Sequence, residues 1–293
     1  MYQIVVISGK GGTGKTSFLA SLAVLFESKV IVDADVDAPN LHILLSPQII
    51  EKNEFYGAGK AKILDDICTY CGKCKEICPF DAIYEKEGKF FVDEISCESC
   101  GLCYHFCPSN AITFEKTISG EWFISDTSYG KLVHAHLFPG EENSGLLVSI
   151  LRQKAVEIAQ IENKKFVLID GPPGIGCPVI SAITGVNLAI ILTEPTLSAI
   201  HDMKRVINVL RHFKIPAGIV INKFDLNLKN TDKILEYCEK EGLKVFGKIP
   251  YDDTVYDALH DCKPFIFYDC KAKKSVEEIY SSLQRFWQSG QIP

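Results

Sequence analysis

A glycine-rich loop between a strand pattern and a helix pattern lies at the start of this chain and constrains its fold most strongly. Residues 2–7 are apolar and β-branched, which predicts a buried strand. Residues 9–16 read Gly-Lys-Gly-Gly-Thr-Gly-Lys-Thr, and apolar residues at helical spacing follow. This context is typical of a phosphate-binding P-loop. Strand and helix patterns alternate through most of the 293 residues, which predicts an α/β fold with a doubly wound, mostly parallel sheet.

The P-loop predicts a site for a nucleoside triphosphate. Backbone N–H groups of such a loop surround phosphate oxygens at the positive end of a helix. Lys15 is expected to reach the β- and γ-phosphates, and the Thr16 hydroxyl is expected to bind Mg²⁺. The remaining residues expected to line the phosphates are Gly11, Gly12, Thr13, Gly14 and Ser17.

Eight of the twelve cysteines form one pattern that occurs twice. Each run reads C-x2-C-x2-C-x3-C-P, and the second lies 29 residues after the first. This spacing binds [4Fe–4S] clusters, and thiolate sulfur is a soft ligand that iron–sulfur clusters favour. Zinc sites, which usually pair two C-x2-C hooks, and disulfides, which need an oxidising compartment, are the alternatives. The runs are Cys68, Cys71, Cys74 and Cys78, then Cys97, Cys100, Cys103 and Cys107.

The segment 57–118 resembles a bacterial two-cluster ferredoxin at all eight ligand positions. In such ferredoxins the fourth cysteine of each run binds the other cluster. The resemblance implies a small inserted α+β domain at 57–118, within a nucleotide-binding domain made of residues 1–56 and 119–293. It also implies two cofactors: one [4Fe–4S] cluster on Cys68, Cys71, Cys74 and Cys107, and a second on Cys97, Cys100, Cys103 and Cys78.

Lys10 follows the first glycine of the loop, and this resembles the deviant P-loop of the MinD/ParA family. Mrp-type cluster carriers and the nitrogenase iron protein are relatives of that family. Its signature lysine crosses a dimer interface to the partner's nucleotide. The resemblance therefore implies a homodimer that forms on ATP binding, in which Lys10 stabilises charge in the transition state.

Acids that follow two further predicted strands resemble switch I and Walker B of the same family. The resemblance implies that Asp35 orients or deprotonates the attacking water. It implies that Asp33 helps to hold Mg²⁺ or Thr16, and that Asp170 contacts Mg²⁺ through water. The Gly174 N–H would sense the γ-phosphate.

Two segments in the last third of the chain indicate which nucleotide base the site binds. Residues 222–225 read Asn-Lys-Phe-Asp, which resembles the guanine-reading motif of small GTPases. In MinD-like proteins, however, the asparagine at this place, here Asn222, contacts adenine. Pro250 and Asp252 lie in a segment that resembles the loop around that adenine. The family resemblance favours ATP, and GTP stays open as an alternative.

Composition limits the partners. The net charge of −6 argues against binding nucleic acid through a basic surface. No apolar stretch reaches the roughly 18 residues of a membrane span. Amphipathic residues 276–287 have few basic side chains, so packing on the sheet is expected in place of membrane binding. The N-terminus does not read as a signal peptide, and free thiols and cluster ligands favour the reducing cytoplasm.

Together these patterns predict an ATPase that couples ATP binding and hydrolysis to electron transfer through two clusters to a redox partner. One rival is a cluster carrier or metal-cofactor assembly factor that delivers to an acceptor protein. Another is a MinD-like spatial organiser with redox sensing. Cys177 follows switch II, where the nitrogenase iron protein binds a cluster between two subunits. A bridging cluster here would need more ligands than the sequence offers.

Overall fold

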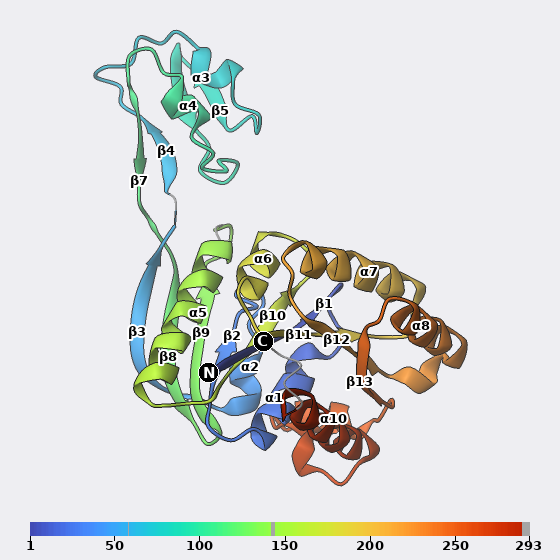
Figure 1. Ribbon diagram of the computed structural model, residues 1–293. Helices are drawn as coiled ribbons and strands as arrows, with labels where there is room; N and C mark the ends of the chain where they lie inside the picture. Colours follow the sequence, from blue (N-terminus) through green and yellow to red (C-terminus); the bar gives the residue numbers. More distant parts are fainter. Residues whose placement is uncertain (58, 142–143, 289–293) are drawn as a thin grey trace. The chain divides into compact units, whose positions relative to one another are not determined.

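The chain is described by a computed structural model for residues 1–57, 59–141 and 144–288 (Figure 1). It divides into two compact units. The first is built from Met1–Lys52, Trp122–His136 and the chain from Ser144 onward. The second contains Asn53–Glu121 and the short segment that begins at Leu137. The sequence-based boundaries at 57 and 118 differ slightly from this division, because the strands Gln48–Tyr56 and Ile118–Thr127 run across the two junctions nearest to them.

A nine-stranded sheet forms the centre of the first unit. Every neighbouring pair from β13 to β9 is parallel, which confirms the predicted α/β fold with a mostly parallel sheet. In order across the sheet, the strands are β13 (Lys244–Ile249), β12 (Ala217–Asn222), β11 (Leu188–Thr193), β1 (Tyr2–Ser8), β10 (Phe166–Pro173), β2 (Lys29–Asp33), β9 (Gly130–Leu137), β8 (Ile118–Thr127) and β3 (Gln48–Tyr56).

The central strands are apolar runs because helices cover both of their faces. All of β2 is buried, and so is all of β11. The register of β1, β10 and β2 also places two acidic residues side by side at one edge of the sheet. Val6 of β1 lies opposite Asp170 of β10, and Asp170 lies opposite Asp33 of β2. The carboxyl ends of parallel strands therefore bring these two acids together beside the P-loop.

Helices pack on the two faces of this sheet (Figure 1). The core on one face includes α1 (Lys15–Leu25), α2 (Leu41–Leu45), α9 (Thr254–His260) and α10 (Lys271–Gln288). Strands β1, β2, β10 and β11 contact further helices. These are α5 (Ser144–Ile161), α6 (Cys177–Ile183) and α7 (Leu197–His212), while α8 (Leu228–Lys240) packs beside β13.

The last helix packs on the sheet, as its periodicity predicts. Val276, Ile279 and Leu283 of α10 are buried. Gly247 of β13 makes room for them, because a Cβ there would lie 2.4 Å from Ile279 Cγ1. The apolar face of α10 is thus occupied within the chain. In the described ranges, none of the helices combines the length and apolar character needed to cross a membrane.

The second unit repeats its structure with the same offset as its cysteines. Each half contributes a strand, a one-turn helix and a second strand. Strands pair across the halves, since β4 is antiparallel to β7 and β5 is antiparallel to β6. The two halves are thus interlocked by backbone hydrogen bonds. The first half holds β4 (Lys60–Ile63), α3 (Lys73–Glu76) and β5 (Ile83–Lys86), and the second β6 (Lys89–Val92), α4 (Leu102–His105) and β7 (Ile112–Glu115).

The apolar core of the second unit is small. Its fully buried members are Ala61, Ala82, Ile83 and Ile112, together with two of the cysteines. A core of this size rarely stabilises a domain alone, and small natural domains usually add disulfides or metals. All twelve cysteines are free thiols. The fold of this unit therefore lacks the disulfide cross-links that would compensate for its small core.

Candidate functional site

The P-loop forms an open anion site at the start of α1. Gly12 and Gly14 have φ angles of 77° and 89°, a region that favours glycine. A Cβ on Gly14 would also lie 2.7 Å from Asn222 Nδ2. Gly14 is the N-cap of α1, which begins at Lys15, and no side chain caps the helix. The first N–H groups of α1 therefore stay available for phosphate oxygens.

Three carboxyl groups lie next to this loop. Asp170 is buried, and burial raises its pKa to about 7 although the Lys15 charge and the Thr16 hydroxyl lower it. Burial and the charge of Asp170 raise the pKa of Asp33. Burial also raises the pKa of half-buried Asp35, against the charge of Lys15. The Thr16 hydroxyl favours the charged form from nearby but does not reach hydrogen-bonding geometry with either carboxylate oxygen of Asp170, and no other group in the described ranges does so. An orphaned buried carboxylate fits a cation or its water shell.

Asp170 makes the stability of the nucleotide-free protein depend on pH. Its folded-state pKa of about 7 exceeds the ordinary 3.8, so folding favours the protonated carboxyl. This contribution is fully present below the ordinary pKa and is lost as pH rises through the folded value. The lowered pKa of His134, about 4, acts in the opposite direction over the same range, so the contribution of Asp170 is measured as a difference between two proteins. In urea titrations without Mg²⁺ or nucleotide, the free energy of unfolding of the wild type should fall relative to that of Asp170→Asn between about pH 4 and pH 7. A difference that does not change with pH would count against the assignment.

Both predicted switch segments are held by hydrogen bonds within the chain in this structure. Asp33 Oδ1 accepts a hydrogen bond from the Asp35 N–H at 3.3 Å, and Oδ2 accepts one from the Leu41 N–H at 3.0 Å. The Gly174 N–H donates to the Ser8 carbonyl at 2.9 Å. The Gly174 N–H is therefore engaged by the chain's own backbone in this structure.

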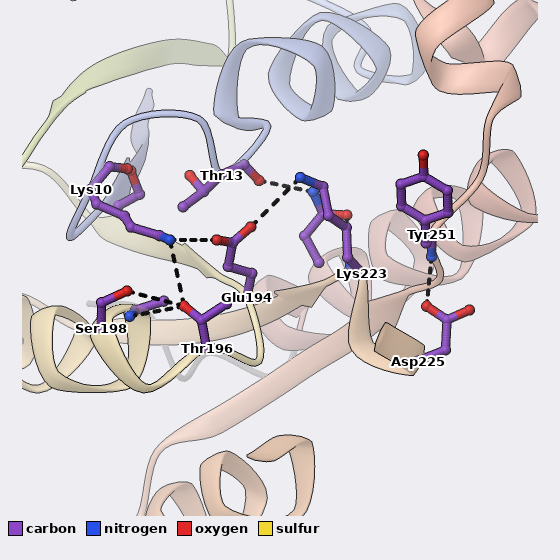
Figure 2. Close-up of polar contacts among 11 residues, drawn as sticks. Lys10, Thr13, Glu194, Thr196, Ser198, Lys223, Asp225 and Tyr251 are labelled. Atoms are coloured by element: carbon purple, nitrogen blue, oxygen red, sulfur yellow. Dashed lines mark hydrogen bonds and ion pairs between the residues drawn. The ribbon is translucent and has the colours of Figure 1, made fainter. Parts of the chain in front are cut away.

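Glu194 holds two lysines beside the P-loop (Figure 2). Lys10 Nζ lies 2.5 Å from Glu194 Oε1 and donates to Thr196 Oγ1 at 3.5 Å. Lys223 Nζ lies 3.6 Å from Glu194 Oε2. Within one chain Lys10 thus has a carboxylate partner. Glu194 was not among the residues predicted from the sequence, although an acid just after a predicted strand at the ligand-binding edge of the sheet was a usable signal.

The Asn-Lys-Phe-Asp segment joins the P-loop to the loop after β13 (Figure 2). Asn222 Nδ2 donates to the Thr13 carbonyl at 2.8 Å. Asp225 Oδ1 accepts a hydrogen bond from the Tyr251 N–H at 2.7 Å. One oxygen of Asp225 is therefore engaged by the chain's own backbone. This arrangement places the segment next to the phosphate site while it holds a neighbouring loop.

Asp252 caps two helices in this structure. Its Oδ1 accepts from the Thr254 N–H at 3.1 Å. Its Oδ2 accepts from the N–H groups of Lys271 at 2.8 Å and Ala272 at 3.2 Å. Burial would raise the pKa of Asp252, but these donors outweigh burial and lower it. The structure thus gives this carboxylate a capping task, while Pro250 lies half-buried just before it.

The second unit contains two cavities of similar size, each lined by four cysteines. The space between the thiols, counted together with the solvent that opens into it, is about 300 Å³ in cavity 1 and about 330 Å³ in cavity 2. Each takes three cysteines from one run and the fourth from the other. In the described ranges, no group of three or more His, Cys, Asp or Glu side chains is arranged so that it could hold a single metal ion. Cavity 1 is lined by Cys68, Cys71, Cys74 and Cys107, and cavity 2 by Cys97, Cys100, Cys103 and Cys78.

Comparison with known proteins establishes the family. Residues 4–265 match the family described as the CobQ/CobB/MinD/ParA nucleotide binding domain. The chain belongs to this family. It is thus a MinD/ParA-type P-loop ATPase, and its parallel sheet and uncapped α1 are the parts of the fold that serve nucleotide binding.

Relatives of this MinD/ParA-type chain match over nearly its whole length. The uncharacterized protein MJ0578 of Methanocaldococcus jannaschii is 36% identical over 97% of both chains. An iron-sulfur cluster carrier protein of Pyrococcus abyssi is 26% identical over 96% of this chain and 85% of its own. The structure of the septum site-determining protein MinD with Mg-ADP from Pyrococcus horikoshii OT3 has a TM-score of 0.61 at 16% identity, covering 98% and 97%. This last likeness shows the fold.

Cys177 is exposed and is the first residue of α6. It lies in the first unit, whereas the eight repeated cysteines lie in the second.

Around the P-loop, the structure brings together seven of the residues that the sequence predicted for the nucleotide site, and it adds two further residues to them. The predicted ones are Lys10, Lys15, Asp33, Asp35, Asp170, Gly174 and Asn222, and the added ones are Glu194 and Lys223.

Proposed function

We propose that this chain is an ATP-hydrolysing iron–sulfur protein that couples nucleotide-driven dimer closure to electron transfer through two [4Fe–4S] clusters to a redox partner. The observation that carries the proposal is the pair of four-cysteine cavities in a chain that also has a P-loop. Clusters supply reversible one-electron storage when bound. The ATPase part supplies two states of the protein, with and without the triphosphate.

The donor set of the second unit suits two clusters. In a [4Fe–4S] cluster each thiolate binds a different iron, so the ligands surround a cavity and do not converge on one point. Four thiols around each cavity meet this requirement, and a single zinc ion would need them to converge. The small core and the free thiols agree, because bound clusters would add the stabilisation that the apolar residues lack. In this proposal the second unit is the inserted two-cluster ferredoxin domain.

In the nucleotide site, the N–H groups of the P-loop and Lys15 bind the phosphates of ATP. The Thr16 hydroxyl binds Mg²⁺, and Asp170 contacts this ion through water. Asp33 helps to hold Mg²⁺ or Thr16. Asp35 orients the attacking water. Its raised pKa, caused first by burial, suits a group that accepts a proton. The remaining contacts are assigned to Gly11, Gly12, Thr13, Gly14 and Ser17 at the phosphates, Gly174 at the γ-phosphate, and Asn222, Pro250 and Asp252 near the adenine.

Dimer closure changes the partner of Lys10. In the resting chain its ammonium pairs with Glu194. In the closed homodimer it would leave Glu194 and reach the nucleotide of the other subunit, where it stabilises charge that develops on the phosphates. Glu194 would then retain Lys223, which already lies on its other oxygen. The ion pair is therefore a cost that ATP-driven closure has to overcome.

Glu194→Gln should make the ATP-bound dimer form more readily. The Lys10–Glu194 pair is partly exposed, at 31% and 14% of the two side chains, so its loss is worth about 1 kcal/mol or less. Closure breaks two such pairs, one in each subunit, so we expect the protein concentration for half-maximal dimerisation with MgATP, measured by sedimentation, to fall by up to about 30-fold. The effect should vanish when Lys10→Gln is also present. A weaker dimer in the single variant would contradict this role of the ion pair.

A second candidate function is a cluster carrier or assembly factor. Two observations favour it: a relative that matches nearly the whole chain is named an iron-sulfur cluster carrier protein, and Cys71 and Cys100 are exposed. Clusters that are delivered have to leave their ligands, so exposed ligands help release. Transfer of iron and sulfide to an acceptor protein on ATP addition would favour this function over electron transfer.

The proposal is tested on one oxygen-free preparation of the full chain. Iron and acid-labile sulfide should match two four-iron clusters per chain, and the same preparation should hydrolyse ATP with Mg²⁺. GTP serves as the comparison nucleotide and should be a poorer substrate. A colourless preparation that contains zinc in place of iron and sulfide would contradict the cluster part, while the ATPase measurement would still report on the nucleotide part.

A further inference from the structure

The repeat within the second unit allows each residue at cavity 1 to be compared with its counterpart at cavity 2. The cysteines are the same in both, but the side chains around them differ. Reduction adds negative charge to a cluster. Hydrogen bonds to ligand sulfur and nearby cations therefore raise its potential, while carboxylates and burial lower it. This rule predicts how each difference between the two cavities changes the reduction potential of the cluster that would bind there.

The first difference is a pair of hydrogen-bond donors at Cys107, in cavity 1. The Ala111 N–H donates to Cys107 Sγ at 3.3 Å, and the Ser109 hydroxyl lies 3.6 Å from the same sulfur. Either atom of the second contact can donate while Cys107 is a thiol, but a thiolate ligand has no proton, so the Ser109 hydroxyl would then be the donor. The counterpart of Ser109 is Phe80, which lines cavity 2 and has no donor to offer. Among the described residues, no hydrogen bond to Cys78 Sγ is found. The Cys107 sulfur thus has donors that its counterpart lacks.

The second difference is charge. Lys73 has its ammonium 5.9 Å from the ring of Phe106, the residue before Cys107. The counterpart of Lys73 is Leu102, an apolar residue that lines cavity 2. Glu98 also lines cavity 2, where the uncharged Thr69 lines cavity 1. The chain next to Cys107 of cavity 1 therefore has a cation beside it, and a carboxylate lines cavity 2.

The third difference is burial. Cys97 and Cys103 of cavity 2 are buried, whereas their counterparts Cys68 and Cys74 of cavity 1 are only half-buried. Burial disfavours the extra negative charge of a reduced cluster. This again lowers the potential at cavity 2.

Two features act in the opposite direction. His105 lies beside Gly101 of cavity 2, and its counterpart in the first half is the carboxylate Glu76. Lys60 Nζ donates to the Cys97 carbonyl at 2.9 Å, which places a cation beside cavity 2. Its bond is to a backbone oxygen, whereas Ser109 and Ala111 act on a ligand sulfur itself. Glu98 also provides an opposing charge at the same cavity. The balance of the differences therefore favours reduction at cavity 1.

We propose that cavity 1 holds the cluster of higher potential, that it takes the first electron, and that Ser109 is the residue that sets this order. The inference rests on the proposed function, since it requires both clusters. In the reaction one electron from a reductant reduces one cluster, and no bond forms or breaks. An electron that enters at cavity 2 would then move to cavity 1, so the two halves of the repeat are not interchangeable.

The test is a redox titration of the anaerobic full chain with dithionite and mediator dyes, followed by electron paramagnetic resonance. Wild-type protein should show two separate one-electron waves. Ser109→Ala should shift the upper wave to lower potential and leave the lower wave in place. Phe80→Ser, which introduces a hydroxyl at the matching position of the other repeat, should shift the lower wave upward. Ser96→Ala is the matched control, because that hydroxyl donates to Asp93 and not to a thiol.

The outcomes separate this inference from the proposal on which it rests. A single wave for both clusters in the wild type would overturn the inference, and so would a Ser109→Ala variant that moves the lower wave, both waves equally, or neither. Absence of any cluster signal, with iron and sulfide missing, would instead overturn the proposed function and this inference with it. Separate waves with only the upper one moved by Ser109→Ala support the inference.

Discussion

ATP hydrolysis by the Lys10→Gln variant is expected to fall by about 10³-fold or more, while its affinity for ATP changes little. The reason is a division of work between two lysines. Lys15 is buried at the start of α1, and its proposed role is to bind phosphates in the ground state. Lys10 would act only when the dimer closes, and a cation supplied in this way is worth roughly 10³–10⁵ in rate. Steady-state hydrolysis and equilibrium nucleotide binding measure the two effects separately.

The matched control is Lys223→Gln, which removes the other lysine that pairs with Glu194. It should keep most of the hydrolysis rate. Mixing Lys10→Gln with Lys15→Gln provides the stronger test, because a mixed dimer has one site with an intact P-loop that faces an intact Lys10. Partial recovery of activity is expected. If the mixture stays inactive, or if Lys10→Gln loses binding as severely as rate, Lys10 acts within its own chain.

The second large effect concerns cluster content. Cys107→Ala should remove one of two clusters and about half of the iron, because a four-iron cluster takes four cysteine ligands. Adding Cys68→Ala should remove no further iron, since both residues line cavity 1. Adding Cys97→Ala should remove the rest, because Cys97 lines cavity 2. Iron and acid-labile sulfide per chain are the measurements.

Grouping of the ligands by run would reverse this pattern. Cys107 would then share a cluster with Cys97, and the Cys107→Ala/Cys68→Ala pair would lose all of its iron. The matched control is Cys238→Ala, since Cys238 is buried in the first unit and takes part in neither cavity. Its iron content should equal that of the wild type. The double variants thus test the crossing of ligands between the two runs.

The regular elements around the nucleotide site could be predicted because their signals are local. The apolar runs that become β1, β2, β10 and β11 are continuous, as expected for strands that are covered on both faces. The P-loop lies between a strand and a helix as its motif requires. Family membership follows from the same residues, and the match over 4–265 confirms it.

The contacts among site residues could not be predicted, because they depend on which elements become neighbours. The pairing of Lys10 with Glu194 joins residues far apart in the sequence, and so does the bond from Asn222 to the Thr13 carbonyl. The capping task of Asp252 depends on where α10 begins. No local spacing carries this information.

The second unit shows the same limit. The cysteine spacing predicts the type of cofactor, but it does not show which fourth cysteine joins which run. That grouping depends on the pairing of β4 with β7 and of β5 with β6, which crosses the two halves. The resemblance to two-cluster ferredoxins implied the crossing, and the structure groups the eight thiols in the same two sets around cavities 1 and 2.

If nucleotide binding and the clusters are coupled as proposed, the midpoint potentials of the clusters depend on the nucleotide state, and a redox titration measures this. The full chain, purified without oxygen, is titrated to obtain the midpoint potentials of both clusters, first without nucleotide and then with Mg²⁺ and a non-hydrolysable ATP analogue. Coupling requires that the two states differ in free energy of reduction. At least one midpoint potential should shift on nucleotide binding. Coincident titration curves in the two states would contradict this coupling.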